Sequence, residues 1–130
     1  MAKKRNKQRP QVGVLGKLIT RRSRGMCELC ESKEDTRLYE LWPFPEEPEP
    51  ERTLMLCGRC RTWMDDEEIV PVQAHFLSSA VWSEEPAVKL AAARMLLFNE
   101  DPEDPWLRDA LDAADIDPVS RELRVHEVEA

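Results

Sequence analysis

The chain of 130 residues is predicted to fold as one small, α-rich α+β domain, and three features carry this prediction. Two C-x-x-C motifs, at Cys27–Cys30 and Cys57–Cys60, contain every cysteine of the chain. Between them, short runs that alternate apolar and polar residues are typical of β-strands. After about residue 69, apolar residues recur at helical spacing and Asp-Pro pairs mark helix starts.

The N-terminal residues combine a basic arm with a short helix. We expect residues 1–11 to form a disordered basic arm, because they are polar, charged and interrupted by a proline. Apolar and basic positions then recur at helical spacing, which predicts a helix from about Val14 to Ser23 with Gly25 as its C-cap.

The stretch between the two cysteine motifs predicts a β-hairpin followed by a helix. Residues 36–42 (T-R-L-Y-E-L-W) and 53–56 (T-L-M-L) favour strands. The acidic, proline-rich residues 43–51 exclude a helix or a central strand, so they are expected to form a loop, partly polyproline II. A helix over 58–64 would end at the four acids 65–68, because carboxylates are unfavourable at a helix C-terminus.

The C-terminal region, residues 69–126, is predicted to be helical and to pack on residues 12–68 within a single domain. Helices are expected over 72–81, 83–98, 106–113 and 119–125. Ser83 would cap the second helix, and Asp104-Pro105 and Asp117-Pro118 would start the last two. The residues of the second helix expected to be buried are Ala87, Val88, Ala91, Met95 and Leu96.

The cysteine spacing predicts a closed metal site. Each C-x-x-C motif offers two thiolates, and two motifs supply the four-thiolate tetrahedral set of structural zinc. We therefore expect Cys27, Cys30, Cys57 and Cys60 to hold Zn²⁺ in a zinc ribbon or treble clef. Iron is the alternative, because rubredoxin-type sites use the same four ligands. A closed site has no open coordination position, so the metal would be structural and no catalytic residue is predicted.

Charge is divided unevenly along the chain. Residues 1–24 hold nine Lys and Arg and no acid, whereas the remainder holds ten basic and 26 acidic residues. The remainder therefore has a net charge of −16, although the net charge of the whole chain is only −7. Candidate nucleic-acid contacts are Lys3, Lys4, Arg5, Lys7, Arg9, Arg21, Arg22 and Arg24. The acidic remainder would repel phosphates, so a protein partner is preferred, docking on the exposed part of a helix from Trp82 to Met95 or on loop 43–51.

Other functional classes lack their signals in this sequence. No apolar stretch approaches the roughly 20 residues that a membrane span needs. The basic N-terminus lacks the pattern of a signal peptide, so we expect a reducing, cytoplasmic location with metal-bound thiols. His75 is predicted to be a packed or exposed helical residue, and the four tryptophans (Trp42, Trp63, Trp82, Trp106) are predicted to belong to the core.

The run R-G-M-C-E-L-C, a strand, then L-C-G-R-C and a helix resembles the metal-bound frame of HNH nucleases. Those enzymes carry histidines at the end of the strand, where this chain has Glu40, Leu41 and Trp42. The resemblance therefore implies the frame without a general base or a magnesium site.

A closer resemblance covers about residues 18–125. The motifs C-E-L-C and L-C-x-x-C, followed by V-W-S-E-E-P-A-V at 81–88 and A-R-M-L at 93–96, resemble the N-terminal zinc-ribbon region of the proteobacterial PhnA family. This resemblance implies a zinc held by the same four cysteines and a bacterial, PhnA-like interaction module. The family takes its name from an alkylphosphonate-utilisation operon, so a role in phosphonate metabolism is a further alternative.

Overall fold

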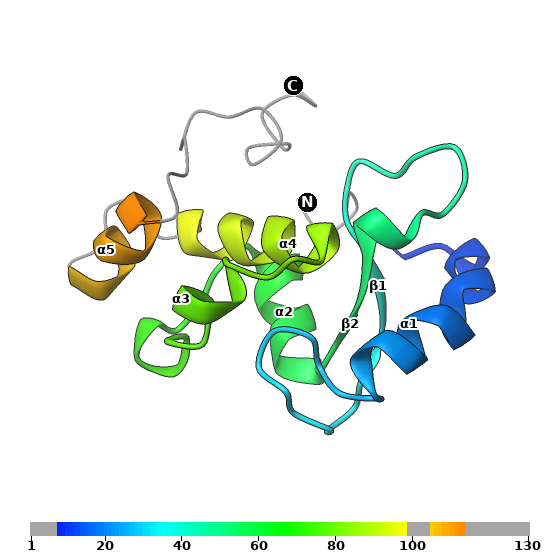
Figure 1. Cartoon of the computed structure of the whole chain (residues 1–130), viewed down its shortest axis with the longest axis horizontal. Coiled ribbons are helices and arrows are strands. Elements are labelled where there is room, and N and C mark those ends of the chain that lie inside the picture. The colour runs from blue at the N-terminus through cyan, green and yellow to red at the C-terminus, as the bar shows by residue number, and fades with distance from the viewer. Residues whose placement is uncertain (1–7, 99–104, 114–130) are drawn as a thin grey trace.

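The computed structural model describes residues 8–98 and 105–113, which form a small α+β structure with one two-stranded sheet. Its elements in chain order are η2 (Pro10–Leu15), α1 (Gly16–Ser23), β1 (Arg37–Glu40), η3 (Pro50–Arg52), β2 (Thr53–Leu56), α2 (Gly58–Asp66), η4 (Pro71–Gln73), α3 (Leu77–Ala80), α4 (Pro86–Leu97) and α5 (Pro105–Ala113), where η denotes a 3₁₀ helix. The helices α1 and α5 lie at opposite ends of the molecule, with the hairpin, α2 and α4 between them (Figure 1).

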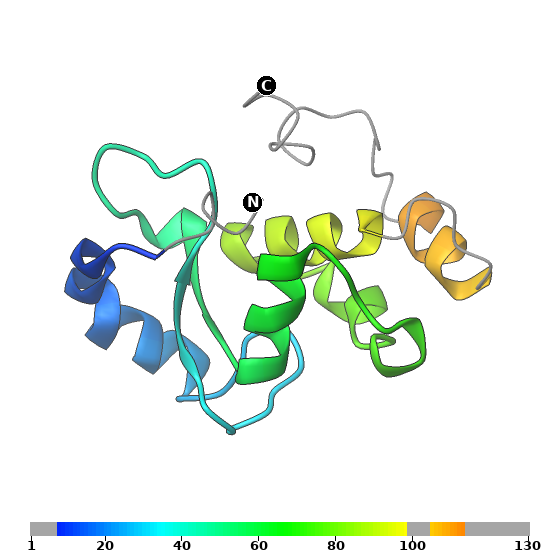
Figure 2. The ribbon, with the colours of Figure 1, turned by 180° about the vertical axis from the view of Figure 1, so that it is seen from behind.

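The hairpin and α2 form the centre of the structure. The strands are antiparallel, with Arg37 opposite Leu56 and Glu40 opposite Thr53. Strand β2 is buried along its whole length and leads directly into α2, which lies between the hairpin and α3 when the molecule is seen from behind (Figure 2). The Tyr39 hydroxyl joins strand and helix by donating a hydrogen bond of 2.6 Å to Asp65 Oδ1. Burial and this bond both raise the pKa of Tyr39, so it stays a donor.

The core combines the apolar side chains of the hairpin with helix α4. Tyr39, Leu41, Leu54 and Leu56 are fully buried, as are Met95 and Leu96. The residues that the sequence assigned to the buried face of this helix are all buried, which confirms that prediction. Ala92, Ala93, Arg94 and Leu97 are buried as well, so α4 lies within the core and offers little exposed surface to a partner.

The predicted helix over 72–81 is wrong in part, because the chain forms two short helical pieces there. Residue Ala74, at the end of η4, has φ −113° and ψ 16°, which is not helical. Ala74 and Leu77 are both fully buried, whereas His75 between them is exposed. Ala74 and Leu77 thus both face the core, although a turn separates them.

Helix α4 begins later than the sequence indicated. Its N-cap is Glu85 rather than Ser83, and Pro86 is the first helical residue. The ring of a proline disfavours helical geometry in the preceding residue, and Glu85 is accordingly extended. The Ser83 hydroxyl instead accepts a hydrogen bond from the Glu85 amide, 3.1 Å away, within the turn that precedes the helix.

The N-terminal helix ends where the sequence predicted, but the residues before it are also ordered in the structure. Arg24 and Gly25 have positive φ angles of 58° and 75°, which terminate α1. Helix η2 starts at Pro10, and Gln8 and Arg9 contact β1, so the predicted disordered arm is wrong for residues 8–11. The rest of the arm, residues 1–7, and the helix predicted over 119–125 lie outside the described residues.

Side chains occupy both edges of the two-stranded sheet. On β1, the Gln8 amide bonds the backbone N–H and C=O of Glu40, at 2.5 and 3.1 Å. On β2, the Met55 N–H donates to the Glu28 carboxylate at 2.9 Å, and its C=O accepts from the Glu28 amide at 2.8 Å. At these positions the surrounding chain therefore occupies the backbone groups of the sheet edges. Among the described residues, no helix is long and apolar enough to cross a membrane.

Candidate metal centre

The four cysteines meet at one point, as their spacing predicted. Their Sγ atoms all lie within 4.8 Å of one another, and all four thiols are free of disulfides. The Sγ of Cys30 is 3.6 Å from that of Cys57 and 3.9 Å from that of Cys60. Four sulfurs bound tetrahedrally at about 2.3 Å from zinc would be about 3.8 Å apart. The cluster therefore fits a zinc-sized ion, and its ligands alone do not distinguish zinc from iron.

Two different local structures present the cysteines. The first pair lies in the turn after α1, where the Cys27 amide donates to Ser32 O at 2.8 Å and the Glu31 amide donates to Cys27 O at 2.9 Å. The second pair belongs to the start of α2, with Cys57 as N-cap residue and Cys60 in the first turn. The positive end of the helix dipole favours thiolates at such a position.

The chain itself stabilises negative charge in the cluster. A hydrogen bond from Cys60 lowers the pKa of Cys27 to about 5, assisted by backbone hydrogen bonds with Cys30, Cys57 and Leu29 and opposed by burial. Donating that bond, together with burial, raises the pKa of Cys60. At least one thiolate is thus present at neutral pH, which suits metal binding.

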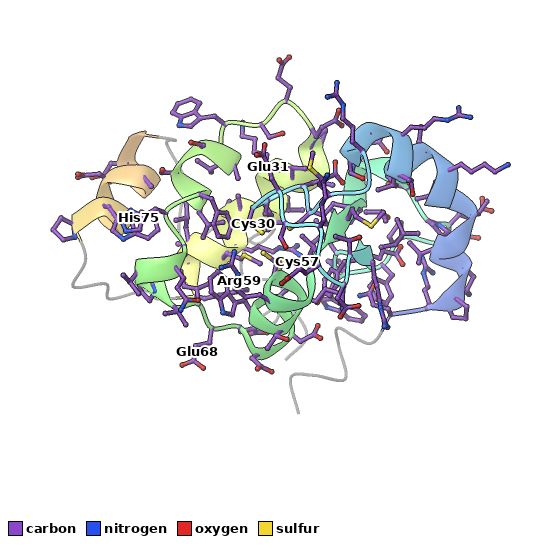
Figure 3. The ribbon with its side chains drawn as sticks, turned by 90° about the horizontal axis from the view of Figure 1, so that it is seen from below. Cys30, Glu31, Cys57, Arg59, Glu68 and His75 are labelled. Atoms are coloured by element: carbon purple, nitrogen blue, oxygen red, sulfur yellow. The ribbon has the colours of Figure 1, made fainter. Side chains whose placement is uncertain are left out.

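Arg59 supplies positive charge beside the cluster. Burial alone would lower the pKa of this guanidinium, but interactions with the thiol groups of Cys30, Cys60 and Cys57 outweigh burial and raise it. The group lies over the rings of Trp63 and Phe76, at 4.9 and 5.3 Å from their centroids. Figure 3 shows Arg59 next to Cys30 and Cys57 on one face of the molecule.

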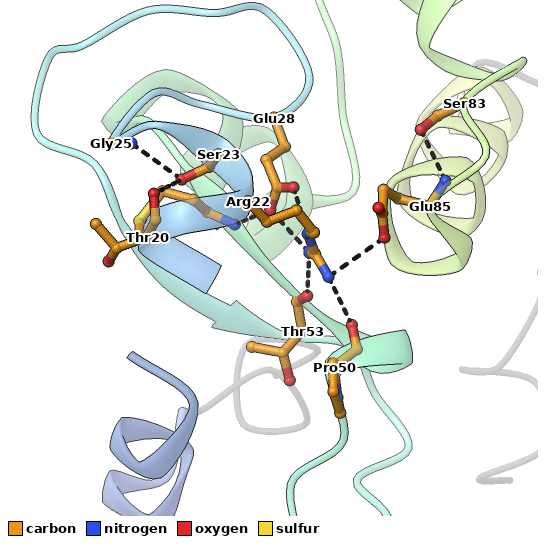
Figure 4. Close-up of polar contacts among 10 residues, drawn as sticks. Thr20, Arg22, Ser23, Gly25, Glu28, Pro50, Thr53, Ser83 and Glu85 are labelled. Atoms are coloured by element: carbon orange, nitrogen blue, oxygen red, sulfur yellow. Dashed lines mark hydrogen bonds and ion pairs between the residues drawn. The ribbon is translucent and has the colours of Figure 1, made fainter. Parts of the chain in front are cut away.

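Arg22 joins the first cysteine motif to the rest of the fold (Figure 4). Its guanidinium binds both carboxylate oxygens of Glu28, at 2.7 and 2.9 Å, and donates to the carbonyls of Thr53 and Pro50, at 2.8 and 3.2 Å. Glu85, before α4, lies 3.6 Å away. Burial alone would lower the pKa of Arg22, but the nearby carboxylates, Glu28 foremost, raise it.

The predicted nucleic-acid residues divide into three groups. Lys3, Lys4, Arg5 and Lys7 lie outside the described residues. Arg9 and Arg22 are engaged in internal ion pairs, because Arg9 binds both carboxylate oxygens of Glu40 at 2.7 Å. Arg21 and Arg24 are exposed, and sequence reasoning did not include the exposed Lys17 on the same helix.

The position that would carry the HNH histidine holds no accessible base. Glu40 is fully buried and paired with Arg9, and Leu41 beside it is also buried. His75 lies elsewhere, stacked on Trp106 with ring centroids 4.3 Å apart. Trp63 is buried as predicted, but Trp82 is 61% exposed, so its assignment to the core is wrong.

Sequence reasoning missed Glu28, which holds the first cysteine motif against Arg22 and β2, and the contacts of Gln8 and Arg9 with Glu40 at the edge of β1. The only available signal was the placement of an acid between the first two cysteines, six residues after an arginine.

No family model, curated protein or solved structure matches the chain. The assignment of the metal centre therefore rests on the geometry of its four sulfurs.

Proposed function

We propose that this protein is a zinc-dependent, non-catalytic interaction module of the treble-clef, PhnA-like type. The observation that carries the proposal is the convergence of four cysteine sulfurs within 4.8 Å. The order of the supporting elements, a cysteine turn, a hairpin and a helix with cysteines at its start, agrees with a treble clef. Four thiolates fill a tetrahedral ion, so the metal would stabilise the fold rather than bind substrate.

A protein is the preferred partner. Of the two predicted docking surfaces, the segment from Trp82 to Met95 is largely buried in α4, although Trp82 before that helix is 61% exposed, so the acidic loop 43–51 is the preferred candidate. Its exposed carboxylates are those of Glu46, Glu47, Glu49 and Glu51. Such a surface would suit a partner with a basic face, since complementary charge raises association rates and selects partners.

Metal analysis of the purified protein tests the first part of the proposal. We expect one zinc ion per chain, retained through gel filtration. Iron in its place would change the cofactor, and a protein that folds without metal would refute the proposal.

For the partner, cross-linking in cells should capture a protein with the wild-type loop and lose it when the four loop glutamates are replaced by glutamine. A matched variant with Glu31, Glu34, Glu68 and Glu84 replaced by glutamine should keep that partner.

A second candidate, nucleic-acid binding, is favoured by one observation on α1. The side chains of Lys17, Arg21 and Arg24 are exposed and, among the described residues, make no hydrogen bond or ion pair. Val14 and Leu18, on the same stretch of chain, have exposed apolar side chains. Exposed cations gathered on a helix and at its C-cap in an acidic protein are suited to phosphate contact.

Fluorescence anisotropy on unrelated oligonucleotides would distinguish the two candidates. Replacing Lys17, Arg21 and Arg24 by glutamine should weaken binding for all sequences and reduce the slope of log K against log salt by about 2–3. The control replaces Lys33, Arg37 and Lys89, an equal loss of charge elsewhere on the surface. The arm is best removed by deleting residues 1–7, because Gln8 and Arg9 hold β1. Equal effects of both triple variants would exclude α1 as the binding surface.

A further inference from the structure

The four metal-site cysteines differ in their access to solvent. Cys27, Cys57 and Cys60 are 1%, 3% and 0% exposed, whereas Cys30 is only half-buried. Cys30 is therefore the cysteine of the cluster that a solute molecule can reach most easily.

A cavity of about 330 Å³ opens beside this cysteine. Its walls are formed by Cys30, Ser32, Glu34, Asp35, Cys57, Gly58 and Arg59. It holds many times the roughly 30 Å³ that one water molecule takes up in the liquid, so a small polar molecule can reach the Cys30 sulfur. The two other cysteines of the cluster do not line it.

From this arrangement we infer that Cys30 is a modification site at which a small peroxide oxidises the metal centre. The inference rests on the proposed zinc site, because a metal-bound thiolate remains a nucleophile whose reactivity follows its exposure. Cys57 is the resolving partner, since its sulfur lies 3.6 Å from that of Cys30 and borders the same cavity.

The reaction proceeds in two balanced steps. The Cys30 thiolate attacks one peroxide oxygen and breaks the O–O bond, which leaves a sulfenic acid on Cys30 and releases hydroxide. The Cys57 thiolate then attacks the Cys30 sulfur, forms the S–S bond and expels a second hydroxide. Together the two thiolates lose two electrons, and the peroxide gains them. The disulfide removes two of the four ligands from the site.

Arg59 moderates this reaction. Its guanidinium is fixed over Trp63 and Phe76, and Arg59 lines the same cavity as Cys30 and interacts with its sulfur, so it draws electron density from that sulfur. Replacing Arg59 with methionine would remove the charge and keep an apolar side chain on the rings. Oxidation by the uncharged peroxide should then become several-fold faster.

Hydrogen peroxide added to the full-length, zinc-loaded protein tests the inference. Zinc release is followed with a chromogenic chelator, and oxidised cysteines are located by mass spectrometry with a reagent that traps sulfenic acids. We expect the trapped sulfenic acid on Cys30 first, then a Cys30–Cys57 disulfide that appears together with zinc release. The Arg59→Met variant should release zinc several-fold faster than wild type.

Two histidine variants give a matched comparison. Cys30→His and Cys60→His each keep four ligands, because zinc accepts three cysteines and one histidine. Zinc release should be several-fold slower in Cys30→His and close to wild type in Cys60→His. If either variant binds no zinc, the trapping experiment on the wild type decides alone. Uniform oxidation of all four cysteines, or first trapping at another cysteine, would refute the inference. Absence of zinc before peroxide is added would instead refute the proposed function.

Discussion

Arg22 connects its own helix, α1, to four other segments of the chain through a single guanidinium group. It links α1 to the first cysteine motif, to η3 and β2, and to the residue that precedes α4. The Glu28 carboxylate that it holds also accepts the Met55 amide. Loss of the Arg22 guanidinium would leave the largely buried Glu28 carboxylate and the carbonyls of Pro50 and Thr53 without this donor. Unpaired acceptors are costly in a protein interior.

We predict that Arg22→Met lowers the free energy of unfolding by roughly 2–3 kcal/mol, because a largely buried, bidentate ion pair is broken. Urea denaturation of the zinc-loaded protein measures this change. The neighbouring variant Arg21→Met is the control, since Arg21 is exposed, and it should change stability by less than about 0.5 kcal/mol. Equal effects of the two variants would show that the network contributes little.

Glu40 shows how burial decides what a residue can do. In the resemblance to HNH nucleases drawn from the sequence, it occupies the place of a histidine, but it is fully buried against Arg9 and cannot reach a substrate. We therefore predict that incubating plasmid DNA with the protein and Mg²⁺, Mn²⁺ or Zn²⁺ gives only background cleavage on gels. Cleavage that disappears in the His75→Ala variant would contradict this and identify a different catalytic residue.

Among the elements, those with purely local causes were predictable from sequence. Strand β2 and the start of α2 lie where the apolar run and the second cysteine motif placed them. The single helix predicted over 72–81 was wrong in part, because Ala74 and Leu77 are both buried but lie on either side of a turn. The ion pairs of Arg9 with Glu40 and of Arg22 with Glu85 were not predictable, since they join residues 31 and 63 positions apart.

Helix α4 is buried almost all round, and its small residues allow this. Ala87, Ala91 and Ala92 are all 0% exposed. We predict that Ala91→Leu lowers the free energy of unfolding by about 1–3 kcal/mol, because the closely packed core has no space for the larger side chain. Thermal unfolding followed by circular dichroism measures it. Lys89→Leu on the exposed side of the same helix should have an effect within about 0.5 kcal/mol.

On the scale of the whole molecule, the metal centre borders the apolar core, because Cys27, Cys57 and Cys60 belong to the buried cluster that also contains the hairpin and α4. The four cysteines tie the turn after α1 to the start of α2, whereas α4 contributes no ligand. Removing the metal should therefore loosen the molecule unevenly. Apparent binding energies of structural zinc reach about 10–16 kcal/mol, so the change should be large.

We predict that a strong chelator removes hydrogen-exchange protection from residues 26–35 and from α2 first, while α4 keeps its protection longer. Exchange measured by mass spectrometry, with and without chelator, tests this. Protection should return when zinc is added back in slight excess. If the chelated protein shows the exchange pattern of the loaded one, the metal does not support the fold.

The side chains that cover the sheet edges restrict how another protein can bind. Many recognition domains accept an extended peptide as an additional strand, which requires free backbone groups along an edge. Here Glu28 and Arg22 occupy those groups on β2, and Gln8 occupies them at Glu40 on β1. A partner that arrived as an extra strand would have to displace these contacts, including the ion pair beside the metal centre. An added strand is therefore disfavoured at these positions, whereas a protein that contacts exposed side chains would leave the backbone contacts of the sheet intact.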